Sequence, residues 1–154
     1  MHKLQWSDAL SLDMPGMDDG RKTLVHLLGL AHEAHDPFLL QRWRDLVQHT
    51  ALVFAQEDRW MQMTQFSSSR IHSTQHKVVL QVMQEGLREG ESGDLAPVQN
   101  MVAELGQWFA NHTQSMDAAL ALHLRRVGYD PQTGVLSMPD EMRLQPNARS
   151  CFQA

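Results

Sequence analysis

The sequence contains a single cysteine, Cys151, among its 154 residues. A lone thiol has no partner within the chain, which excludes an internal disulfide framework and favours a reducing compartment. The sequence has no apolar run of about 18 residues, and its first residues lack the apolar stretch of a secretory signal. We therefore predict a cytoplasmic protein without a membrane segment.

Charge of either sign is modest. Lys and Arg number 13 against 18 Asp and Glu, the net charge is −5 with the nine histidines neutral, and basic residues form no block. Nucleic acids and anionic membranes are therefore not expected partners. Gly (9) and Pro (6) are too few for a disordered or collagen-like chain, and 42 % apolar residues can supply the core of one domain.

Strand patterns are nearly absent, and apolar residues instead recur at spacings of three and four, which is typical of amphipathic helices. We predict four helices, over residues 17–35, 37–63, 70–89 and 94–126. Because short turns join them, the predicted fold is all-α, an up-down-up-down four-helix bundle. The bundle is expected to span residues 17–127, after an N-terminal arm (1–16) anchored by Leu4 and Trp6 and before an irregular C-terminal tail (128–154).

Five side chains of metal-ligand type fall on the predicted inward faces. His72 and His76 are four residues apart, so both imidazoles leave one face of a helix. Alone this pair is a weak signal, because satisfied core histidines show the same spacing. Glu57 on the second helix and His112 and Asp117 on the fourth are expected to face the same interior. Buried carboxylates are unfavourable unless paired or bound to a cation, so the set predicts a metal site.

The spacing of His112 and Asp117 makes a further structural prediction. Five residues of a regular α-helix turn through about 500°, which leaves the two side chains about 140° apart. Both can reach one ion only if it lies off the flank of the helix or if a π-bulge widens the turn. We predict such a bulge near residues 111–117.

These motifs resemble the hemerythrin family, particularly its short bacterial members. The family pattern has a His early in the first helix, HFxxE(E/D) in the second, HxxxH in the third and HxxxxD in the fourth. The resemblance covers roughly residues 4–128. The matching residues are Phe54, Glu57, Asp58, His72, His76, Trp108, Phe109, His112, Met116 and Asp117.

The resemblance implies two irons that carry dioxygen reversibly. Glu57 and Asp117 would bridge the irons, and His72, His76 and His112 would supply the imidazoles of one of them. At two positions this sequence departs from the family pattern. There the histidines expected for the second iron are replaced by Arg21 in the first helix and by Val53 in the second.

A buried guanidinium is strongly unfavourable without carboxylate partners. We therefore hypothesise that Arg21 occupies the position of the second metal and pairs with Glu57 and Asp117, which bidentate Arg–carboxylate geometry allows. Val53 would fill the volume of the missing imidazole. The expected site then holds one ion.

From this we predict a hemerythrin-like metal-binding protein with a degenerate site, active in metal- or oxygen-related binding or sensing. Iron is the expected ion, with zinc and manganese as alternatives because affinity order does not choose among them. Dioxygen or another small diatomic molecule is the expected further ligand. The sequence shows no general base beyond the ligands, so we predict no enzyme, and it indicates no particular protein partner.

Three alternatives remain open at this point. The first is a metal-free helical bundle that serves interaction or signalling. The second is a diiron oxygen-binding protein in which another residue rescues the second site. The third is a mononuclear redox enzyme.

The remaining candidates receive ordinary structural roles. His49 is expected to be a hydrogen-bonded histidine rather than a substitute ligand, although it lies one turn before Val53. His26 is expected to face outward and Gln75 to lie on the surface. Trp108 is expected to pack in the core.

Overall fold

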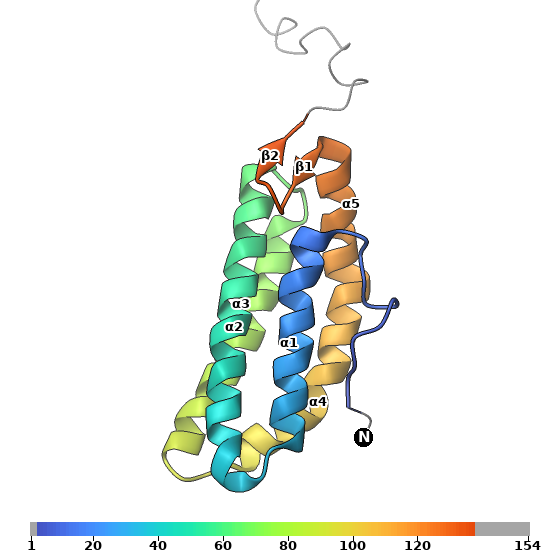
Figure 1. The fold of residues 1–154 in the computed structure, drawn as a ribbon. Coiled ribbons are helices and arrows are strands. Elements are labelled where there is room, and N and C mark those ends of the chain that lie inside the picture. Colours follow the sequence, from blue (N-terminus) through green and yellow to red (C-terminus); the bar gives the residue numbers. More distant parts are fainter. Residues whose placement is uncertain (1–2, 138–154) are drawn as a thin grey trace, which may run out of the picture.

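The computed structural model describes residues 3–137, in which the helices pack side by side as an elongated bundle (Figure 1). The fourth helix of the bundle is continuous but contains a π-helical segment, η1. The elements are α1 (Pro15–Glu33), α2 (Asp36–Met63), α3 (Ser69–Glu91), α4 (Ala96–His112), η1 (Thr113–Asp117) and α5 (Ala118–Val127). Consecutive helices contact one another and α1 also contacts α4, which closes the bundle. The predicted all-α four-helix fold is confirmed.

The helix ends follow their local sequence. Helix α1 begins at Pro15, two residues before the predicted start, because proline suits the first turn of a helix. Helix α4 begins at Ala96 rather than at the predicted position 94, and the Ala96 amide donates a hydrogen bond to Oδ1 of Asp94 at 3.1 Å. Helix α5 ends at Val127, one residue after the predicted end, and is capped by Gly128, whose φ of 72° lies in the left-handed region that glycine adopts readily.

A short hairpin follows the bundle where the sequence indicated only an irregular tail. Strand β1 (Tyr129–Asp130) pairs antiparallel with β2 (Val135–Leu136). Strands of two residues are too short to show an alternating pattern, which is why the sequence did not reveal them. Residues 138–154, including Cys151, lie outside the described part of the chain.

Two apolar clusters fill the bundle, one toward each end. Members of the first include Leu24, Leu28, Leu46, Met83 and Phe109. Members of the second include Met17, Trp60, Met61, Leu120 and Leu124. On the fourth helix, His112 and Asp117 lie between Phe109 and Leu120. A buried polar layer therefore separates the two clusters.

The N-terminal arm runs along the outside of the bundle (Figure 1, dark blue). Leu4 and Trp6 pack against the first cluster, as expected, and Leu10 belongs to it. Leu12 packs against the second cluster. The arm thus passes beside the polar layer and is attached on both sides of it.

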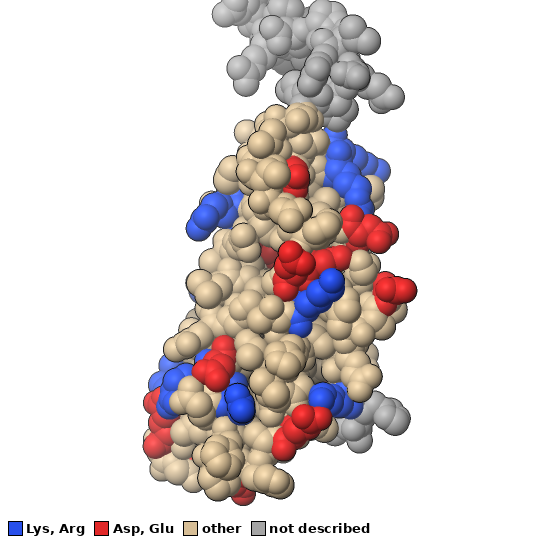
Figure 2. Space-filling view, in the orientation of Figure 1, with Lys and Arg blue, Asp and Glu red and all other residues tan. Residues whose placement is uncertain are grey.

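The described residues contain no helix long and apolar enough to span a bilayer. On the face drawn in Figure 2, acidic and basic side chains are interspersed rather than gathered by sign.

Candidate metal centre

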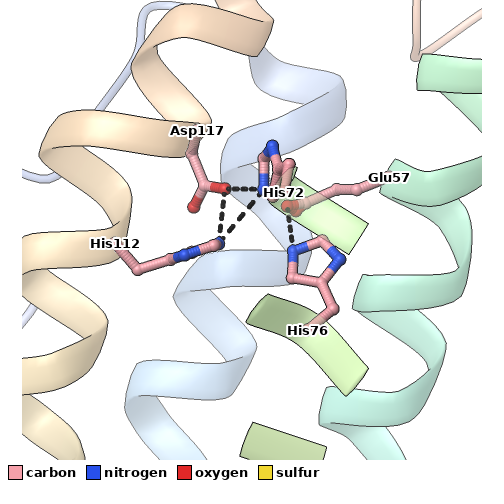
Figure 3. A group of neighbouring side chains, drawn as sticks. All are labelled: Glu57, His72, His76, His112 and Asp117. Atoms are coloured by element: carbon pink, nitrogen blue, oxygen red, sulfur yellow. Dashed lines mark hydrogen bonds and ion pairs between the residues drawn. The ribbon is translucent and has the colours of Figure 1, made fainter. Parts of the chain in front are cut away.

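The five predicted ligand residues converge inside the bundle (Figure 3). Glu57 comes from α2, His72 and His76 from α3, His112 from the end of α4 and Asp117 from the end of η1. All five are buried, with at most 3 % of each residue exposed. One ligand atom of each lies within 4.8 Å of the corresponding atoms of the others.

The π-helical segment brings the two residues of the fourth helix together. The Ala118 amide donates to the carbonyl of Thr113, a hydrogen bond across five residues instead of four. With this wider turn, His112 and Asp117 share one face, and Nε2 of His112 lies 3.1 Å from Oδ1 of Asp117. The predicted π-bulge is confirmed.

The ligand atoms lie closest together at His72, His112 and Asp117. The Nε2 atoms of the two histidines are 3.1 Å apart. Oδ1 of Asp117 is 3.2 Å from Nε2 of His72. On the other side of the cluster, Nε2 of His76 lies 3.8 Å from Oε1 of Glu57.

The cluster leaves buried ligand atoms without hydrogen bonds. Among residues 3–137, these include Nε2 of His76, Oε1 of Glu57 and Oδ1 of Asp117. Buried polar atoms are normally hydrogen-bonded, and leaving one unpaired costs about 1–3 kcal/mol. Atoms that bind a first-row metal ion at about 2.1 Å lie about 3 Å from one another. The donor set therefore fits such an ion, and imidazole with carboxylate suits iron, manganese or zinc.

Asp58 fixes the orientation of His76. A carboxylate only accepts hydrogen bonds, so Nδ1 of His76 donates to Oδ1 of Asp58, at 2.9 Å. Ser73 donates to the same oxygen at 2.8 Å. Burial alone would raise the pKa of Asp58, but these hydrogen bonds outweigh it and the pKa lies below the usual value. Because the proton of the neutral ring is on Nδ1, Nε2 presents its lone pair to the cluster.

Burial lowers the pKa of His76 although Asp58 opposes the shift. The imidazole is therefore neutral near pH 7, as metal binding requires. Asp58 matches a family motif in the sequence, but its role was not predicted, because nothing in the sequence indicates which side chain of α3 it faces.

Gln75 plays the corresponding part for His112. Its Oε1 lies 3.2 Å from Nδ1 of His112, which turns Nε2 toward the cluster. The prediction that Gln75 lies on the surface is incomplete, since the residue is only partly exposed and its side chain reaches His112. Its position three residues after His72 places it beside the ligand face of the helix, a signal that could have identified it.

Two aromatic rings hold the imidazoles from their faces. Phe54 stacks on His76 with ring centres 4.0 Å apart and planes 6° from parallel. Trp108 stacks on His112 at 4.7 Å and 15°. Trp108 also packs against the first apolar cluster, so the predicted core role is confirmed but incomplete.

The pKa values of the two carboxyl groups in the cluster are shifted in opposite directions. Burial would raise the pKa of Asp117, but its contacts with His112 and His72 and the positive charge of Arg21 outweigh burial and hold the pKa far below the usual value. Burial and the neighbouring Asp117 charge raise the pKa of Glu57 well above its usual value. Asp117 is thus the permanent anion of the cluster.

Arg21 lies next to Asp117, but its guanidinium is oriented mainly by Asp18. Its Nε is 3.4 Å from Oδ2 of Asp117, whereas its Nη1 lies 3.0 Å from Oδ1 of Asp18. The expected contact with Asp117 is present. The expected contact with Glu57 is not seen, because Asp18, three residues earlier on the same helix, pairs with the guanidinium instead.

The predictions for His49 on α2 and His26 on α1 are confirmed. Val53 is buried, at 7 % exposure. Nε2 of His49 lies 2.7 Å from the carbonyl oxygen of Gly20, so this ring is a hydrogen-bonded histidine outside the cluster. His26 is exposed on α1.

Two proteins named Bacteriohemerythrin are similar to this chain. The protein from Ralstonia nicotianae (strain ATCC BAA-1114 / GMI1000) is 31 % identical over 130 residues, which cover 84 % of this chain and 95 % of that protein. The protein from Pseudomonas paraeruginosa (strain DSM 24068 / PA7) is 25 % identical over 122 residues, which cover 77 % and 79 %. No protein-family model matches the chain.

Proposed function

The chain belongs to the bacteriohemerythrin family, and from this premise we propose that it binds a single metal ion in the cluster of five side chains. The observation that carries the proposal is the convergence of buried ligand atoms that have no hydrogen-bond partner within the described residues. Three imidazoles and a carboxylate anion offer a cation more favourable partners than they offer one another.

Each donor has a defined part in this proposal. His72, His76 and His112 would bind through Nε2, Asp117 through Oδ1, and Glu57 through its carboxylate. Iron is the ion that the family favours, and the same donors accept zinc or manganese. A bound iron ion would supply affinity for dioxygen or another small diatomic ligand.

The single-ion stoichiometry is supported by the residues beside Asp117. The guanidinium of Arg21 is 1 % exposed and already places a positive charge at Oδ2 of Asp117. A second divalent ion there would meet that charge at short range, in a buried site where screening is weak. Val53 offers only an apolar side chain at the corresponding position of α2.

We propose binding or sensing rather than catalysis. The titratable groups of the cluster are all assigned as ligands. Of their polar neighbours, Asp58 and Gln75 are held by imidazole nitrogens and Arg21 by carboxylates. Each of these neighbours orients a ligand, and none is left to move a proton to or from a substrate.

The test is the metal content of protein purified without chelators, measured by elemental analysis. The wild type should carry about one equivalent per chain, and His112→Ala should lose it. His26→Ala, which removes an exposed histidine, is the matched control and should retain the ion. A wild type without metal, or a His112→Ala variant that keeps it, would contradict the proposal.

A further inference from the structure

Asp18 is a buried carboxylate that binds the N-terminal arm. It lies in the first turn of α1 and is 6 % exposed. The Ser11 hydroxyl donates to its Oδ2 at 2.6 Å, and the Leu12 amide donates to its Oδ1 at 3.0 Å. The third partner is Arg21, whose Nη1 donates to Oδ1 at 3.0 Å. The same carboxylate thus holds two consecutive residues of the arm and a buried cation.

Arg21 continues this connection from the arm to the metal cluster. Its Nη2 donates to the carbonyl of Leu10 at 2.8 Å and to the hydroxyl of Thr113, the first residue of η1, at 2.9 Å. Its Nε and the Thr113 hydroxyl both lie 3.4 Å from Oδ2 of Asp117. Oδ2 is therefore held from the side of the arm, which leaves Oδ1 facing the imidazoles.

An aromatic ring of the arm also contacts the guanidinium. The ring centre of Trp6 lies 5.5 Å from the central carbon of Arg21, and that of Phe109 on α4 lies 5.9 Å away. Both distances fall within the range of cation–π attraction. If the arm left the bundle, Arg21 would lose the Trp6 ring and the Leu10 carbonyl together.

We propose that Asp18 is a positioning residue of the metal site that acts through Arg21, and that docking of residues 6–12 and metal binding favour each other. This inference rests on the proposed function. Two effects both raise the affinity of the site for a metal ion. The docked arm fixes Arg21 and thereby the ligating orientation of Asp117. The Asp18 charge also offsets that of Arg21, which would otherwise repel a bound cation.

Coupling of this kind is reciprocal, since the factor by which docking raises metal affinity equals the factor by which metal favours docking. The coupling can be measured as a change in metal affinity or as a change in docking of the arm. The arm provides its own reporter, because the Leu12 amide is hydrogen-bonded to Asp18 only while the arm is docked.

The experiment is amide hydrogen exchange of the full chain with and without Zn(II), a redox-inert probe ion. Zn(II) should slow exchange of the Leu12 amide by about fivefold or more, in the range of typical coupling energies. The Asp94 amide, bound to the Glu89 carbonyl in the turn between α3 and α4 at the other end of the bundle, is the internal reference and should change less. In Asp18→Asn, Zn(II) should no longer slow exchange of the Leu12 amide, and Zn(II) binding should be weaker by a similar factor.

Asp19→Asn is the matched control, because it removes the same charge from the exposed neighbouring residue. It should leave both the affinity and the exchange of the Leu12 amide unchanged. If Asp18→Asn does not fold, the exchange of the wild-type Leu12 amide with and without Zn(II) still tests the inference. Zn(II) binding without slower exchange at Leu12 relative to Asp94 would overturn the inference but not the proposed function. Equal loss of affinity in the Asp19 variant would also overturn the inference, and absence of Zn(II) binding would overturn both proposals.

Discussion

Asp58 offers a test of the site through a residue that would not touch the ion. Its carboxylate accepts the Nδ1 proton of His76 at 2.9 Å and so directs Nε2 into the cluster. In Asp58→Asn, the amide oxygen can still accept this proton, but the charge that strengthens the hydrogen bond is lost. The amide can also rotate to present its donor to Nδ1, which would favour the wrong tautomer.

The expected loss of metal affinity in Asp58→Asn follows from the position of Asp58. Hydrogen-bond partners of metal-binding histidines typically contribute 10–100-fold in affinity. The side chain of Asp58 is 34 % exposed, so solvent screens part of its charge, and the asparagine keeps an acceptor. We therefore expect a loss at the lower end, about tenfold, or about 1.4 kcal/mol. Asp58→Ala, which removes the acceptor, should lose closer to 100-fold.

Competition titrations of Zn(II) against a chromophoric chelator measure this affinity directly. Urea unfolding of the metal-free variants separates effects on affinity from effects on stability. The free energy of unfolding of metal-free Asp58→Asn should fall by no more than about 1 kcal/mol, as for the loss of one ordinary hydrogen bond. Glu85→Gln removes a charge from an exposed residue of α3 and serves as the control. An Asp58→Asn affinity within twofold of the wild type would refute the assigned orientation of His76.

Three further predictions follow from the same geometry. Arg21→Ala leaves Asp18 buried without its cation and should lower the free energy of unfolding of the metal-free protein by about 3–5 kcal/mol, measured by urea denaturation. The double change Arg21→His and Val53→His should raise the metal content from about one to about two equivalents, because it restores both imidazoles of the family pattern. Free metal at 100 times the dissociation constant should stabilise the wild type by about 2.7 kcal/mol, or raise its thermal midpoint by about 5–10 °C, and chelator should reverse the shift.

Local spacing in the sequence was sufficient for the helices and for much of the site. The recurrence of apolar residues at three and four predicted the helices to within a few residues. The five-residue separation of His112 and Asp117 predicted the π-helical segment, because a regular helix cannot turn both side chains to one side. These inferences concern residues of one helix, where backbone geometry determines which side chains share a face.

Contacts between elements were harder to predict. Asp58 meets His76 only because α2 and α3 pack in a particular register, and that register is not visible in the periodicity of either helix. The arm presented the same difficulty, since a carbonyl oxygen such as that of Leu10 carries no sequence signal. The pairing of Asp18 with Arg21 could have been predicted, because Asp18 lies three residues before the buried Arg21. An acidic residue in the first turn of a helix also suits the helix dipole, so the sequence alone does not require a specific partner for Asp18.

The most direct test of the single-ion site is anomalous diffraction from crystals of the iron-loaded protein, recorded at the iron absorption edge. We expect one anomalous peak, surrounded by the side chains of Glu57, His72, His76, His112 and Asp117. A second peak at the position of the Arg21 guanidinium would contradict the single-ion site. A map without a peak in the cluster would contradict metal binding by these residues altogether.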